Sequence, residues 1–124
     1  MKKLTTKWFR KWFRKADLGN ENLLKAVSDL EEGLSTTNLG GHLFKVRVMR
    51  EGSGKRSGYR TIIVFRRDDR AIFLYGFGKN ERGNIDNTEL NYFKKLGRDL
   101  LTLNSSQLLK AINDKVLYDL EDTK

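Results

Sequence analysis

Two glycine-containing segments hold most of the side chains that could act on a phosphate. The first, residues 52–60 (GSGKRSGYR), combines three glycines with Lys55, Arg56 and Arg60. Glycine lets the backbone approach a phosphate closely, and Lys and Arg neutralise its charge. The segment has neither the spacing of a P-loop nor the Ser or Thr that follows Gly-Lys there. A hairpin loop without a ligand would explain the same glycines.

The second segment is residues 75–83 (YGFGKNERG), at the end of an expected strand. Lys79, Asn80, Glu81 and Arg82 gather cations, an amide and a carboxylate, which are groups suited to acid–base work on a phosphodiester. A dinucleotide-binding loop is a poor alternative, because Glu81 stands where the third glycine of that motif belongs. A solvated strand exit with a local Lys–Glu pair is the simpler alternative.

Other catalytic chemistries find little support in the composition. Cysteine is absent and His42 is the single histidine. We therefore expect no disulfide, no thiol nucleophile, no metal site and no cofactor. His42 follows Gly40-Gly41 and is interpreted as a turn residue, and no Ser-His-Asp set can be assembled.

The hydrophobic periodicity predicts an α+β fold in one domain, residues 1–124. Leu4, Trp8, Trp12 and Ala16 recur every fourth residue, which indicates a helix over 5–16 with these residues on its apolar side. A second helix is expected over 21–32, with Asn20 as N-cap and Gly33 at its end. Strands are expected at 44–49, 59–65 and 71–77, followed by helices beyond Asn87 and after Ser105 or Ser106, and by a strand or docking segment at 116–120.

Short connections between the three central strands favour an antiparallel meander. In a meander, the start of strand 59–65 lies beside the end of strand 71–77. Arg60 and Lys79 are then expected near one another, with Lys55 and Arg56 above them. Crowded cations lower the pKa of a lysine among them, which would allow such a lysine to act as a base.

The formal net charge of +9 favours nucleic acid, an anionic surface or an acidic partner. Residues 1–16 carry seven cations and no acid, and residues 42–82 carry eleven cations and four acids. The basic aromatic stretch 7–15 (KWFRKWFRK) resembles an interfacial membrane peptide, but packing of its aromatic side against the domain is the favoured interpretation. No apolar run is long enough to span a bilayer and no signal peptide is visible, so a cytoplasmic location is expected.

Taken together, these segments resemble the RelE/HigB-like toxins of type II toxin–antitoxin systems. The resemblance runs over roughly residues 8–120. It rests on residues 9–16 (FRKWFRKA), 23–27 (LLKAV), 39–41 (LGG), 45–48 (KVRV), 52–61 (GSGKRSGYRT), 73–82 (FLYGFGKNER) and the leucine-rich tail. The two central segments are distinctive as a pair and weak singly.

The resemblance implies a RelE-like fold, in which N-terminal helices pack on an antiparallel sheet and C-terminal helices follow. It also implies cleavage of mRNA, commonly on the ribosome, and inhibition by an antitoxin encoded beside the toxin. The positions that carry over as catalytic are Lys55, Arg60, Lys79 and Glu81. Those expected to bind RNA are Arg50, Lys55, Arg56, Tyr59, Arg60, Asn80 and Arg82. Some members have a histidine near the C-terminus that this chain lacks, which leaves its general acid unassigned.

Two other functions remain open at this stage. ParE-like toxins share the fold and act on gyrase, so the fold alone does not decide the activity. An RNA-binding module without catalysis is the other alternative. A central basic cluster with a carboxylate favours the nuclease, because a protein-only binder does not require it.

Overall fold

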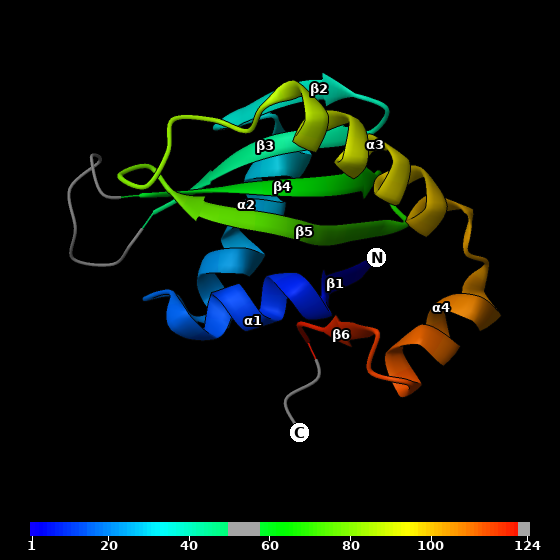
Figure 1. The fold of residues 1–124 in the computed structure, drawn as a ribbon. Helices are drawn as coiled ribbons and strands as arrows, with labels where there is room; N and C mark the ends of the chain where they lie inside the picture. The colour runs from blue at the N-terminus through cyan, green and yellow to red at the C-terminus, as the bar shows by residue number, and fades with distance from the viewer. Residues whose placement is uncertain (50–57, 122–124) are drawn as a thin grey trace.

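The computed structural model describes residues 1–49 and 58–121. These residues form a six-stranded sheet in the order β2-β3-β4-β5-β1-β6, covered by helices on both faces (Figure 1). The strands are β1 (Lys2–Thr6), β2 (Thr36–Gly40), β3 (Leu43–Val48), β4 (Tyr59–Arg66), β5 (Arg70–Gly78) and β6 (Leu117–Asp119). The helices are α1 (Lys7–Lys15), α2 (Asn20–Glu32), α3 (Asn87–Thr102) and α4 (Ser105–Asn113).

The predicted meander is confirmed, because β2, β3, β4 and β5 pair antiparallel in chain order. The expectation of a purely antiparallel sheet is wrong. β1 lies parallel to β5, with Leu4 opposite Ile72, and β6 pairs antiparallel with β1. The sheet is therefore mixed, and a strand precedes the N-terminal helices.

The first helix is shorter than the predicted 5–16. Thr5 belongs to β1, and the Thr6 hydroxyl accepts a hydrogen bond from the Phe9 amide at 3.1 Å, which makes Thr6 the N-cap. The second helix begins one residue early, with Gly19 rather than Asn20 as N-cap, and ends at Gly33 as predicted. Asn104, and not Ser105 or Ser106, caps α4.

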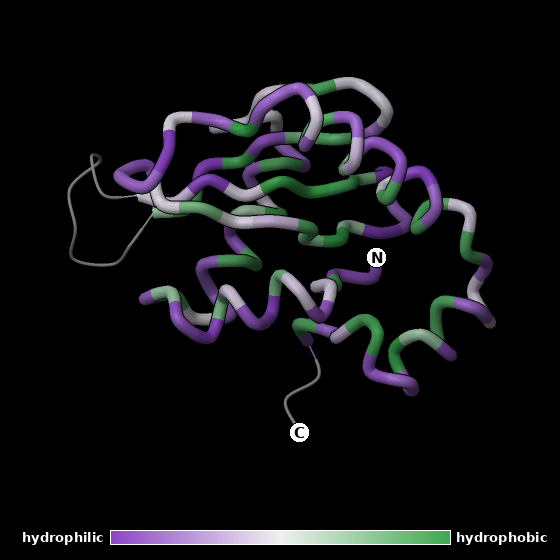
Figure 2. The backbone as a smooth tube through the Cα atoms, in the orientation of Figure 1, coloured by the Kyte–Doolittle hydropathy of each residue, from purple (hydrophilic) through white to green (hydrophobic). Residues whose placement is uncertain are grey.

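Two hydrophobic layers enclose the sheet. On one face, Phe9 of α1 and Leu23 and Val27 of α2 pack with Val46, Ile63 and Phe73 of the strands. On the other face, Phe93 of α3 and Leu108 of α4 pack with residues that include Ile62, Val64 and Ile72. The hydrophobic residues concentrate in the central strands, while α1 is largely hydrophilic (Figure 2).

The turn between β2 and β3 shows the predicted role of His42. Gly40, Gly41 and His42 have φ values of 89°, 61° and 64°. Gly41 and His42 are the two residues of the turn, and positive φ at both suits a turn that joins two twisted antiparallel strands. His42 is exposed at this turn.

Candidate functional site

The start of β4 and the end of β5 meet at one end of the sheet, as the meander predicted. Tyr59 lies opposite Gly78 and Arg60 opposite Phe77. The pairing continues one residue further, because the Lys79 amide donates a hydrogen bond to the Gly58 carbonyl at 3.3 Å. Arg60 and Lys79 are thus diagonal neighbours in backbone position.

Arg60 shares a face of the sheet with Arg47 and Phe77. Arg47 of β3 is its direct cross-strand partner, and Ile62, two residues further along β4, packs in the layer under α3. The Nη1 atom of Arg60 is buried and has no hydrogen-bond partner among the residues that the structure describes. Burial, and then the charge of Arg47, lower the pKa of the Arg60 guanidinium, which still stays protonated at neutral pH. The negative charge of a bound anion would oppose this lowering of the pKa.

Residues 79–82 form the turn that leaves β5. The amides of Glu81 and Arg82 both donate to the Gly78 carbonyl, at 3.0 and 3.3 Å. The Glu81 carboxylate folds back over Gly78, where it lies 2.9 Å from the position that a Cβ would occupy. Gly78 pairs with Tyr59, whose ring packs in the α1 layer, so the Glu81 carboxylate lies on the α1 side and Arg60 on the α3 side.

Arg82, expected to bind RNA, has protein partners. Its guanidinium donates to Glu89 of α3, at 2.8 Å for Nη1, and to the Tyr75 hydroxyl at 3.3 Å. The hydrogen bonds to Glu89, and after them the one to Tyr75, raise the pKa of Arg82. The hydrogen bonds from Arg82, and after them the one from the Asp86 amide, lower the pKa of Glu89. Arg82 therefore fastens the 79–82 turn to the first turn of α3.

Tyr59 is also held by protein contacts on the α1 side of the sheet. Its ring meets Trp12 edge-on with centroids 5.3 Å apart, and its hydroxyl accepts a hydrogen bond from the Asp17 amide at 3.4 Å. Lys79 and Asn80 are exposed on the turn. Arg50, Lys55 and Arg56 lie outside the described residues.

The structure adds two features that the sequence reasoning missed. Arg47 lies beside Arg60 on the sheet. The sequence could have indicated this, because the alternation of the strand predicted at 44–49 puts Arg47 on the opposite face from Val46 and Val48. Trp8, expected on the apolar side of its helix, is 82% exposed. Leu4, which suggested the apolar side of the predicted helix, belongs to β1, so its spacing placed Trp8 on the wrong side.

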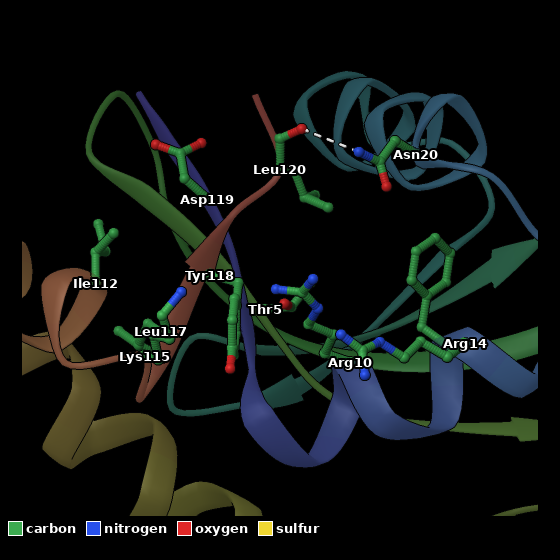
Figure 3. A pocket seen from close by; sticks show the side chains of 11 residues that line it. Thr5, Arg10, Arg14, Asn20, Ile112, Lys115, Leu117, Tyr118, Asp119 and Leu120 are labelled. Atoms are coloured by element: carbon green, nitrogen blue, oxygen red, sulfur yellow. Dashed lines mark hydrogen bonds between the residues drawn. The ribbon is translucent and has the colours of Figure 1, made fainter. Parts of the chain in front are cut away.

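A cavity of about 340 Å³ lies between α1 and β6, away from the end of the sheet that carries Arg60 (Figure 3). Arg10 and Arg14 line it from α1, and the Arg10 guanidinium carbon lies 4.0 Å from the centroid of the Tyr118 ring. Asn20 closes one side by donating to the Leu120 carbonyl at 3.2 Å. Of the residues proposed for catalysis, those that the structure describes (Arg60, Lys79 and Glu81) do not line this cavity.

Residues 1–120 match a family model described as the RelE toxin of the RelE / RelB toxin–antitoxin system. The chain belongs to the RelE toxin family. Comparison with curated proteins gives no significant match. The predicted RelE-like α+β fold is confirmed by the family match together with the mixed sheet and its helices.

Membership in the RelE family makes the chain a toxin of a toxin–antitoxin pair, and its partner an antitoxin. Toxins of this family generally inhibit translation. Among the described residues, no group of three or more His, Cys, Asp or Glu side chains is arranged to hold a metal ion. No helix in the described part of this RelE-family chain is long and apolar enough to cross a membrane.

Proposed function

We propose that this toxin is a metal-independent endoribonuclease that cleaves mRNA, on the ribosome, and thereby stops translation. The observation that carries the proposal is the buried Nη1 of Arg60, which has no hydrogen-bond partner among the described residues and lies beside Arg47 where β4 meets β5. A partly desolvated guanidinium such as that of Arg60 stabilises a phosphate dianion better than a fully solvated cation does, and the exposed Arg47 beside it adds positive charge. A gyrase-binding surface would not need such a pair of arginines.

In the proposed reaction, the 2′-hydroxyl next to the scissile bond attacks phosphorus. A base removes its proton, an acid protonates the leaving 5′-oxygen, and cations stabilise the pentavalent dianion. Arg60 and Arg56 hold the phosphate, and Lys55 contributes charge or acts as the acid. Lys79 or Glu81 is the base.

The placement of the two candidate bases favours Lys79. Strand alternation beyond Gly78 favours the same side for Lys79, Phe77 and Arg60. The Glu81 carboxylate lies over Gly78, on the other side of the sheet. A base must reach the proton that it removes, so a phosphate held by Arg60 lies on the Lys79 side.

Chemistry of the cleavage products tests this function. Purified toxin is incubated with mRNA, free and in translating ribosome complexes, and the new ends are mapped. Attack by the 2′-hydroxyl leaves a 2′,3′-cyclic or 3′-phosphate and a 5′-hydroxyl. Cleavage should persist in EDTA, provided that any ribosome used is kept intact by other means. A 5′-phosphate would show that water is the nucleophile, and intact mRNA in both settings would refute the nuclease.

A further inference from the structure

The outer surface of α1 carries cations that no carboxylate of the described residues neutralises. Lys2 and Lys3 on β1 pair with Asp119 and Glu121. By contrast, the cations of α1 form no ion pair with any described residue: Lys7, Arg10, Lys11, Arg14 and Lys15. The helix also has no acidic residue in its first turn, where the helix dipole would favour one. This surface therefore suits a polyanion.

Trp8 lies within this basic surface. Phe9 is buried, and Trp12 and Phe13 pack partly buried against the same core, so Trp8 is the one aromatic residue of α1 left in solvent, 82% exposed. Lys11 and Lys15 follow it at i+3 and i+7 and share its side of the helix. An exposed indole face between lysines is a stacking platform for a nucleic-acid base.

A cavity of about 360 Å³ connects this side of α1 to the turn after β5. Trp8, Lys11 and Lys15 line it from the helix, and Glu81 and Arg82 line it from the turn. Its floor includes Gly76, where a Cβ would lie 2.3 Å from the Trp12 ring. The same turn carries Lys79, so the cavity and the candidate cleavage site lie on opposite faces of the sheet and meet at this turn.

We propose that this α1 groove (Trp8, Lys11, Lys15 and the cavity beside them) binds the single-stranded part of the RNA substrate that flanks the scissile phosphate. One base stacks on Trp8, and Lys11 and Lys15 contact phosphates. This proposal rests on the proposed function and identifies where its substrate continues. RNA crossing the end of the sheet from Arg60 reaches the groove by way of the 79–82 turn.

Two other occupants fit the groove less well. A membrane surface requires the apolar stripe of α1 to face outward, but Phe9, Trp12 and Phe13 face the core. An acidic peptide, such as a segment of the antitoxin, would neutralise the lysines but offers no planar group to the isolated Trp8 ring. RNA supplies both the phosphates and the planar bases.

Equilibrium binding of a short 2′-O-methyl RNA tests the groove, because that RNA lacks the nucleophile and is not cleaved. Trp8→Ala should weaken binding about 5- to 150-fold, the range for losing one base–aromatic stack, whereas Trp8→Phe should retain most of the affinity. Lys11→Gln and Lys15→Gln should each lower the salt slope by about 0.7. Matched controls on α3 are Tyr92→Ala, at a residue 60% exposed, and Lys95→Gln at an exposed lysine; both should bind as wild type does.

The outcomes separate the groove from the nuclease. Wild-type RNA affinity in Trp8→Ala overturns the inference, and so does a defect confined to binding of the antitoxin or of anionic phosphatidylserine vesicles. Trp8-dependent binding by a protein that cleaves no mRNA would support the groove and refute the proposed function. Cleavage with Trp8-independent binding would do the reverse. Thermal unfolding of each variant confirms that it is folded.

Discussion

Arg60 is the residue on which the proposed chemistry depends most. No hydrogen bond from its Nη1 to a described residue exists, so Arg60→Ala removes no such contact within the protein and, on the proposed function, removes the contact to the phosphate. We expect single-turnover cleavage at saturating toxin to slow by roughly a hundredfold or more, the scale of losing one transition-state charge contact. Lys79→Ala should show a similar loss.

A matched control for these variants is Arg67→Ala, at an exposed arginine near the other end of β4. It should cleave like wild type. Thermal unfolding should show that Arg60→Ala stays folded, because the substitution removes an unpaired cation beside Arg47. Wild-type rates for both Arg60→Ala and Lys79→Ala would show that this end of the sheet only binds RNA.

Gly76 illustrates a residue whose role is purely steric. A Cβ at this position would lie 2.3 Å from the Trp12 ring, so α1 can rest on β5 only if residue 76 is glycine. Gly76→Ala should lower the free energy of unfolding by about 1–3 kcal/mol through overpacking. Gly83→Ala is the control, since nothing lies within 4 Å of its Cβ position. Equal stability of the two variants in urea unfolding would contradict this account.

At the scale of elements, the sequence predicted those with strong periodicity and missed those without it. The strands from 44 to 77 and all four helices carry regular apolar spacing, and the structure contains them. β1 has a single large apolar residue, Leu4, and its place depends on pairing with β5 far along the chain. β2 is half exposed at the edge of the sheet and is defined by its pairing with β3.

For the candidate site, the sequence predicted the backbone positions of the residues but not the partners of their side chains. The meander placed Arg60 and Lys79 at one end of the sheet from local signals alone. Side-chain partners depend on packing between distant elements, so the sequence did not reveal that Arg82 binds Glu89 or that Glu81 folds over Gly78. The exposure of Trp8 follows from β1, because Thr6 caps α1 and sets which side of the helix faces the sheet.

The contact between the 79–82 turn and α3 should respond to pH. Hydrogen bonds from Arg82 lower the pKa of Glu89 below its ordinary 4.5 in the folded protein. Its stabilising contribution is therefore complete above about pH 4.5 and is lost as the pH falls through the lower folded-state value. Glu89→Gln keeps an acceptor for the Asp86 amide but loses the charge.

We expect Glu89→Gln to unfold more easily than wild type at pH 7, and the difference to shrink as the pH falls toward 3. Urea unfolding across this range measures it. Glu32→Gln, at the exposed end of α2, is the matched control and should leave the pH dependence as in wild type. A constant difference between Glu89→Gln and wild type would mean that the Arg82–Glu89 pair does not titrate as proposed.

The charge of the whole molecule bears on both of its partners. The net charge is +9, and two parts of the molecule carry cations without a described carboxylate partner: α1, and the neighbouring Arg47 and Arg60 on the sheet. On the proposed function, an antitoxin that brings acidic side chains, or that covers either surface, would stop RNA from binding. Neutralisation would then need no chemical change, only occupation of these surfaces.

Expression in cells tests the molecule as a toxin and as a nuclease together. Induction of the wild-type chain should arrest growth, and co-expression of the antitoxin encoded beside it should restore growth. Arg60→Ala, expressed to the same level and still bound by the antitoxin, should be harmless, because it loses the phosphate contact and keeps the fold. Cellular mRNA should fragment before DNA supercoiling changes. Harmless wild-type expression, or supercoiling that changes first while mRNA stays intact, would refute the nuclease and favour a protein target such as gyrase.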